Sequence, residues 1–432
     1  MLDNLRAAWT VPDIRQRILV VFGAFALFVY MIHVQIPGVN VKVWQDLLAA
    51  GTFYNFLGFL SGGALQRLSV IAMGITPYIN ASIIMQLMTV VLPQLEEMAK
   101  RGGEEGRKKI SRYTRWLTIV LAFIQATTMS IAMNRSGVFF DRGLPFLIFV
   151  ILSLVSGTLF LMWLGEQITD KGIGNGVSLI IFVGIVLRYP TYLYQTIQVG
   201  QKQGFNYFGL ALFVGIALVT IVSIVFMYQG QRRIPVQQAR RVVGRKMYAG
   251  RSSYIPLRLN NAGVISIIFA ISILLLPQQA LSWFGAAATN QAGPGAAISS
   301  FLNTWFSPNS FFYNLVYFVL VVLFTFFYSA VVVNTRDIAD NLKKSGSFIP
   351  GIRPGQPTVE YINRILIRIT TVSAVYLGLL AILPSTMQRG LGVTTFYLGS
   401  TSLLIIVGVA LDTMTQIEAR LAMRDYRGFM KR

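Results

Sequence analysis

Residues 18–36 read ILVVFGAFALFVYMIHVQI, a stretch without a single Asp, Glu, Lys or Arg. A run of this length and composition is typical of a helix that crosses a lipid bilayer. Similar runs recur along the whole chain of 432 residues, in which apolar types make up 54% and charged types only 12%. The sequence therefore predicts an all-α membrane protein.

Nine more apolar windows follow the first one, which gives ten predicted spans. They cover residues 18–36, 69–92, 116–133, 144–164, 176–193, 207–228, 262–281, 312–334, 365–383 and 393–411. The fifth is the weakest, because Arg188 and Pro190 interrupt its apolar run after about half a membrane thickness. We expect side chains that reach the interface, or neighbouring protein, to complete it.

The distribution of basic residues predicts the orientation. With the amino terminus inside, thirty of the 37 Lys and Arg residues fall in cytoplasmic segments and seven fall outside, Arg188 among them. Because cytoplasmic loops carry this excess, we expect both termini in the cytoplasm. Residues 1–17 have the pattern of an amphipathic cytoplasmic start, so we expect no cleavable signal peptide.

Ten spans divide into five and five, and an odd number in each half allows an inverted repeat. The fifth and tenth spans, which are short or rich in Gly, Ser and Thr, occupy matching positions, as do the second and seventh. In such a repeat, interrupted spans mark the functional midplane. The alternative is that these small residues only let helices pack closely.

Groups for catalysis or ion coupling are scarce. All sixteen acidic residues lie outside the apolar windows or at their ends, the chain has no Cys, and His33 is its only histidine. Intramembrane carboxylates mark proton and ion pathways, so their absence argues against coupled transport. We expect no enzyme activity, metal or cofactor. A secondary transporter of a small solute remains the alternative, since an inverted repeat alone would allow it.

Residues 51–68, GTFYNFLGFLSGGALQRL, are apolar but too short to cross the membrane, and they are broken at Ser61, Gly62 and Gly63. This segment must lie at the interface or re-enter the protein, and the residues alone leave both readings open.

Two loops on the predicted cytoplasmic side are basic. Residues 230–260 hold eight basic residues and no acidic one, and residues 343–358, KKSGSFIPGIRPGQPT, add Lys343, Lys344 and Arg353. Guanidinium groups bind phosphate oxygens well, so these loops suit a polyanion or an acidic protein. The positive charge of these loops could by itself reflect only the excess of Lys and Arg that cytoplasmic loops carry. The three prolines and the permissive Gly351 and Gly355, however, specify a shape, and a fixed shape favours a docking role.

Several long motifs resemble one known family. They are GITPYINASIIMQL (74–87), GRKKISRYTR (106–115), GIGNGVSLIIF (172–182), GQRRIPV (230–236) and DNLKKSGSFIPGIRPGQPT (340–358). Over essentially its whole length the chain resembles the SecY family, the pore subunits of the bacterial protein-conducting channel. The resemblance implies two pseudo-symmetric inverted halves, spans 1–5 in residues 1–190 and spans 6–10 in residues 191–432, around an hourglass pore. It also implies a lateral gate between spans 2 and 3 and spans 7 and 8.

The resemblance also implies roles for individual residues, which fall into four groups. The pore ring would be Ile75, Ile79, Val177, Ile181, Ile268 and Ile405, where Val177 replaces the more usual isoleucine. The plug, residues 51–68, would include Phe56, Leu57, Phe59, Leu60, Gly62, Gly63, Leu65 and Arg67. Asn80 and Gln86 would be polar residues of the lateral gate. The docking residues, in the cytoplasmic loops 230–260 and 335–364, would be Arg240, Arg241, Arg245, Lys246, Lys343, Lys344 and Arg353.

The function implied is a passive conduit in the bacterial cytoplasmic (inner) membrane. It would pass unfolded secretory polypeptides across the bilayer and release membrane segments into it. The SecA ATPase or the ribosome would drive transport, SecE and SecG would be partner subunits, and signal peptides would open the gate.

Overall fold

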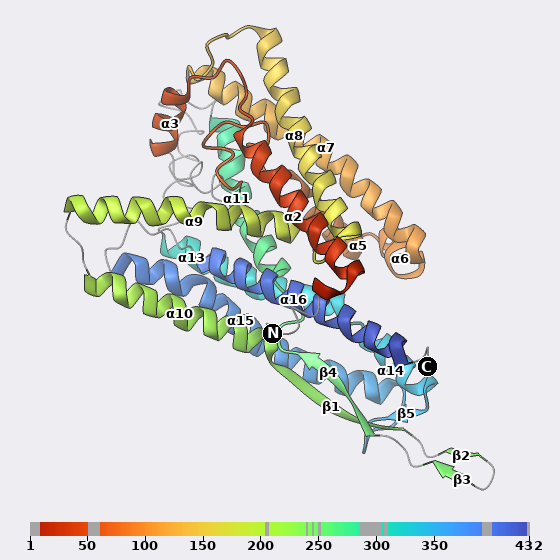
Figure 1. Cartoon of the computed structure of the whole chain (residues 1–432). Helices are drawn as coiled ribbons and strands as arrows, with labels where there is room; N and C mark the ends of the chain where they lie inside the picture. The colour runs from red at the N-terminus through yellow and green to blue at the C-terminus, as the bar shows by residue number, and fades with distance from the viewer. Residues whose placement is uncertain are drawn as a thin grey trace.

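The computed structural model describes residues 9–50, 61–203, 207–238, 241–243, 246–248, 252–285, 305, 310–390 and 400–429. Figure 1 shows a mainly helical molecule in which long helices lie side by side and a small β-structure projects at one end. The long helices are α2 (Pro12–His33), α5 (Thr76–Val91), α7 (Gly103–Arg135), α8 (Leu144–Lys171), α9 (Gly176–Gln203), α10 (Tyr207–Gln229), α11 (Ile265–Gly285), α13 (Phe311–Val332), α15 (Gln356–Gly390) and α16 (Ser400–Phe429). The shorter ones are α3 (Val41–Ala50), α6 (Pro93–Arg101) and α14 (Thr335–Lys344).

Each of the ten predicted spans overlaps one of the long helices. Among the described residues, six helices are long and apolar enough to cross a membrane by themselves. The pair α5 and α6, bent by 104° at Leu92, supplies a further candidate. Residues 176–191, 214–229 and 265–277 form shorter apolar helices, which need neighbouring protein to complete a crossing.

The second span begins later than its hydropathy predicts. Helix α5 starts at Thr76 rather than at residue 69, and Pro77 lies in its first turn, where the missing N–H leaves no helical hydrogen bond unmade. Residues 61–75 form consecutive turns instead. They run back along the end of α2, where Ile36 N donates to Leu68 O at 3.0 Å and Val70 N donates to Val34 O at 3.0 Å.

The fifth span is longer than predicted. Helix α9 continues through Pro190 to Gln203, so Arg188 and Pro190 do not interrupt it. Arg188 is only 4% exposed, so it is covered by protein rather than lying in an open loop. The predicted boundary between the halves, after residue 190, falls inside this helix.

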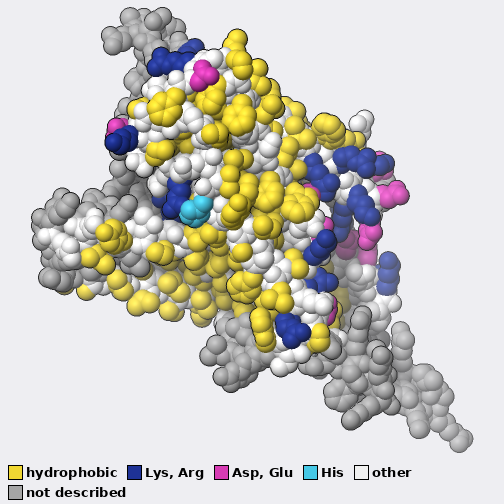
Figure 2. Space-filling model, turned by 45° about the horizontal axis from the view of Figure 1, so that its top comes forward, with side chains coloured by type: hydrophobic (Ala, Val, Ile, Leu, Met, Phe, Trp, Pro, Cys, Tyr) yellow, Lys and Arg dark blue, Asp and Glu magenta, His cyan; other side chains and the backbone are white. Residues whose placement is uncertain are grey.

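Large apolar side chains cover the outside of the helices. On α10, Val219, Val222 and Phe226 are 66%, 67% and 76% exposed and share one face, whereas Ile224 and Met227 are buried. Such a surface is stable only where lipid covers it. Figure 2 shows a wide apolar belt, with the largest group of basic side chains at one end of it.

The helices contact one another in two groups. One contains α2, α5, α7, α8 and α9, and the other contains α10, α11, α13, α15 and α16. The groups meet at two seams. At one seam α9 packs against α16, and at the other α11 packs against α5 and α7.

Strands β1 (Gln231–Gln238), β4 (Ser252–Arg258) and β5 (Ser347–Phe348) form a three-stranded antiparallel sheet in the order β4-β1-β5. Strands β2 (Arg241–Val243) and β3 (Lys246–Tyr248) form a hairpin at the far end of it (Figure 1). The span pattern did not predict these strands. They lie in the two basic loops, and β5 joins the loops into one unit, which we call the loop sheet.

Five buried residues form the core of the loop sheet: Ile234, Val236, Leu257, Ile349 and Ile362. The first three come from β1 and β4, Ile349 follows β5, and Ile362 belongs to α15. Apolar burial therefore anchors the loop sheet on a membrane helix, in addition to its backbone hydrogen bonds.

Candidate functional site

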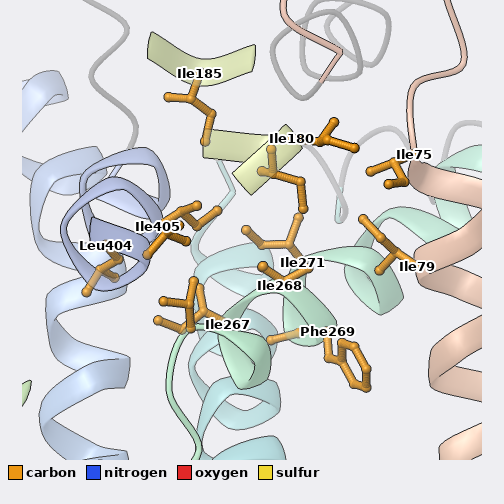
Figure 3. Packing of buried hydrophobic residues seen from close by; sticks show 14 of the residues in the cluster. Ile75, Ile79, Ile180, Ile185, Ile267, Ile268, Phe269, Ile271, Leu404 and Ile405 are labelled. Carbon is orange, nitrogen blue, oxygen red and sulfur yellow. The ribbon is translucent and has the colours of Figure 1, made fainter. Parts of the chain in front are cut away.

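The predicted ring residues come together where the two groups of helices meet. Ile75 precedes α5, Ile79 lies on it, Ile181 lies on α9, Ile268 on α11 and Ile405 on α16. All five are buried in one apolar cluster, and the half-buried Val177 packs against it. Figure 3 shows Ile79 on one side and Ile405 on the other, with Ile268 between them.

The same cluster contains branched residues that the sequence reading missed. Ile180 and Ile185 of α9, Ile267 and Ile271 of α11, and Leu404 of α16 are all buried in it (Figure 3). Ile271 is three residues after Ile268, so helical spacing could have indicated it. Aliphatic side chains offer no groups to replace the hydration shell of an ion.

The described part of the predicted plug lies folded beside this cluster. Gly62 and Gly63 are buried, and Arg67 is exposed. Leu65 is 1% exposed and packs in a second apolar cluster with Trp44 of α3. The indole Nε1 of Trp44 donates to Leu65 O at 2.8 Å. The remaining predicted plug residues, Phe56, Leu57, Phe59 and Leu60, lie outside the described residues.

The seam between α5 and the helices α11 and α13 holds Gln86, one of the two predicted gate residues. The Tyr328 hydroxyl of α13 donates a short hydrogen bond to Gln86 Oε1 of α5. The ring of Phe269 on α11 lies 5.1 Å from that of Tyr328, edge to face. Asn80 is buried, and its Oδ1 accepts no hydrogen bond from the part of the chain that the structure describes. One polar contact therefore crosses a largely apolar seam.

The second basic loop has a defined shape. Gly351 and Gly355 have φ of 80° and 107°, values that side-chain-bearing residues rarely adopt. Between them, Arg353 is exposed, and its carbonyl accepts from Thr358 Oγ1 at 2.8 Å. The guanidinium of Arg353 is thus presented from a backbone that is fixed on both sides.

The other predicted docking residues are distributed around the loop sheet. Lys343 and Lys344 are exposed at the carboxyl end of α14. Arg241 and Lys246 lie in the β2–β3 hairpin, where the structure describes only the backbone. Arg240 and Arg245 lie outside the described residues. Across β1 and β4, the Arg233 guanidinium lies 4.9 Å from the centre of the Tyr254 ring.

In the described ranges, no three His, Asp or Glu side chains are grouped so that they could hold a metal ion. The arrangement offers a buried apolar cluster, a folded segment beside it, a seam between helices and a basic surface at one end.

Comparison with known proteins assigns this arrangement to a family. The family model for SecY matches residues 69–414. The protein translocase subunits SecY of Thermotoga maritima and Escherichia coli K12 are each 42% identical to this chain. These matches cover all of the chain and 98% and 97% of the relatives.

Solved structures show the same fold. A protein-conducting channel matches with a TM-score of 0.65 at 18% identity, covering 94% of this chain and 92% of its own. Canine Sec61, solved in a ribosome-channel complex, matches with a TM-score of 0.61 at 17% identity and the same coverage. With the full-length likeness to the bacterial subunits, these matches lead to one conclusion. The chain belongs to the SecY family, the pore subunits of protein translocases.

Proposed function

We propose that this chain is a passive, gated conduit for unfolded polypeptides, closed by an aliphatic collar and opened by its cargo. The observation that carries the proposal is the central cluster. Ring residues from α5, α9, α11 and α16, far apart in sequence, share one buried apolar core at the meeting point of the two helix groups. A collar of this kind blocks ions yet yields to a threaded chain, because it holds no charge and coordinates nothing.

Two helices each contribute a pair of residues to the collar. Ile75 and Ile79 are four residues apart, as are Val177 and Ile181, so each pair occupies one helix face. Val177 is smaller than isoleucine by one methylene, a change that we expect to have little effect on the seal.

The two helix groups support a division into pseudo-symmetric inverted halves, formed by spans 1–5 and spans 6–10. The lateral gate would be the seam where α11 and α13 face α5 and α7. The contact of Gln86 with Tyr328 across this seam supports the assignment, and Asn80 of α5 would be a second polar residue of the gate. A signal peptide or membrane segment that binds between these helices would shift the population toward the open state.

The loop sheet would be the docking surface for the motor. Arg353, Lys343 and Lys344 are exposed on it, and the β2–β3 hairpin extends from it. We assign this surface to the SecA ATPase and the ribosome, for which the Sec61 ribosome-channel complex is the structural parallel. Binding to ribosomal RNA phosphates would weaken steeply with salt, because each contact releases counterions. A flat salt titration would remove the basis for this assignment.

The setting would be the bacterial inner membrane, with both termini in the cytoplasm and with SecE and SecG as partner subunits. The excess of Lys and Arg in the predicted cytoplasmic segments supports this orientation.

Reconstitution tests the whole proposal. The chain would be placed in lipid vesicles with SecE-type and SecA-type partners, and protease-protected preprotein would be measured with and without ATP. We expect protected preprotein only with ATP and only with the motor present. Protection without ATP, or ATP-dependent uptake of a small solute in place of preprotein, would refute the proposal.

A further inference from the structure

A buried arginine lies on the same helix face as two ring residues. On α9, Val177, Ile181, Gly184 and Arg188 follow one another at intervals of four, three and four residues, so they form one stripe. Val177 and Ile181 belong to or pack against the central cluster. Arg188 follows about 10 Å further along the helix axis, on the predicted external side. The stripe therefore extends the pore wall from the collar toward the outside.

The predicted plug lies directly on this stripe. A Cβ built on Gly62 would be 2.9 Å from Gly184 Cα, so the two backbones touch. A Cβ on Gly63 would be 3.4 Å from Arg188 Nε, which places the guanidinium group against the backbone of Gly63. Gly62 and Gly63 have φ of 65° and 93°, so this turn is built for close approach.

The plug offers this arginine neutral groups rather than an opposite charge. Residues 51–68 contain neither Asp nor Glu. A buried guanidinium is tolerated only where its donors find acceptors, and it carries five N–H groups. Arg188 is only 4% exposed, and the backbone of Gly63 is one of the groups that cover it.

We propose that Arg188 is a latch that holds the plug on the pore wall, and that it becomes a cationic wall residue of the external funnel when the plug leaves. This inference rests on the proposed channel function and adds a positioning residue to it. The latch predicts that loss of the guanidinium favours the unseated plug in a resting channel.

Ion leak through resting channels in vesicles tests the latch. Arg188→Ala should raise the leak about tenfold, the ratio that about 1.4 kcal/mol in the closing equilibrium gives. Arg188→Met, which keeps the length but has no donors, should leak similarly. Arg142→Ala, which removes another arginine on the predicted external side, should leave the leak unchanged. A wild-type leak in either Arg188 variant, or a lower one, would overturn the latch.

The charge preference of the open pore gives a second, independent readout. Gly62→Val should keep the plug unseated, because its side chain would meet the Gly184 backbone. In that background, Arg188→Ala should shift the reversal potential in a KCl gradient toward K⁺ over Cl⁻. Arg142→Ala should not shift it. No shift with Arg188→Ala would show that the residue does not line the pore.

The same vesicles separate this inference from the proposed function. If wild-type channels protect preprotein with ATP while the Arg188 variants leak and conduct like wild type, only the latch is wrong. If wild-type channels protect no preprotein, the channel function itself fails.

Discussion

Isoleucines are prominent in both the central cluster and the core of the loop sheet, yet the backbone around them is held differently. In the loop sheet, Ile234 and Val236 lie on a strand whose backbone is hydrogen-bonded to β4 on one side and to β5 on the other. In the central cluster, Ile79, Ile268 and Ile405 lie on separate helices, each of which satisfies its own backbone. Separating the helices breaks mainly side-chain contacts, whereas separating the strands also breaks a ladder of backbone hydrogen bonds. The helices around the central cluster are therefore suited to separate, whereas the strands of the loop sheet are suited to stay together.

Reversing the charge at Arg353 tests the loop sheet at its proposed docking surface. Of all the variants, we expect this one to have the largest effect. Arg353→Glu should lower motor-driven translocation by more than about a hundredfold, because a lost charge-assisted contact is replaced by repulsion. The backbone bond from Thr358 does not involve the side chain, so the loop should keep its shape. Protease-protected preprotein is the measurement.

Two variants frame that result. Arg353→Lys keeps the charge without the planar fork and should lie between wild type and Arg353→Glu. Arg142→Glu, on the predicted opposite side, should translocate normally. Undiminished transport by Arg353→Glu would contradict the docking role.

Truncating a core isoleucine of the loop sheet tests whether its apolar core stabilises the two basic loops. Ile349 is 2% exposed, so Ile349→Ala should destabilise the unit by about 2–4 kcal/mol. Limited proteolysis of residues 230–260 would report this as faster cleavage. Ile367→Ala, on helix α15, is the control variant, since Ile367 is 50% exposed and its truncation leaves no cavity. Equal cleavage of both variants would mean that the core does not hold the loops together.

A polar residue in the collar should leave folding largely intact and change conduction. Ile405→Asn should hydrate the constriction, because an amide binds water where an aliphatic group does not. We expect open events in single-channel recordings without a signal peptide, and weaker discrimination between signal sequences. Ile405→Val, which keeps the surface apolar, should remain closed. A closed state identical to wild type in Ile405→Asn would count against the collar.

The polar contact across the seam should have the smallest effect. Tyr328→Phe removes the hydroxyl that donates to Gln86, a bond worth about 0.5–1.5 kcal/mol. Gate opening by signal peptides should become easier by up to about tenfold. Combining it with Gln86→Leu in a double-mutant cycle should give a coupling of similar size. Additive effects would show that the bond does not restrain the gate.

Hydropathy predicted where the long helices lie, because lipid contact imposes a strong composition on each span. It failed where protein contact replaces lipid. Arg188 and Pro190 resemble the end of a span, yet α9 passes through both, since protein around the helix covers the arginine. The strands of the loop sheet escaped notice because β1 pairs with β5 more than 100 residues later, and no local pattern records that pairing.

The candidate site divides in the same way. Family motifs located Ile79, Ile268 and Ile405, and the structure gathers them in one cluster. They gave no role to Arg188. The sequence already contains its spacing from Val177, Ile181 and Gly184, but the meaning of that spacing depends on where residues 61–63 fold back, which only the folded structure shows.

The pairing of β1 with β5 has a consequence for exchanging parts between bacterial species. Gln237 and Gln238 are matched with Phe348 and Ser347, so the first basic loop carries half of an interface whose other half lies beyond α13. A chimera that takes residues 230–260 alone from a relative would pair β1 of one protein with β5 of another. We expect such an exchange to succeed when residues 345–358 are taken from the same relative.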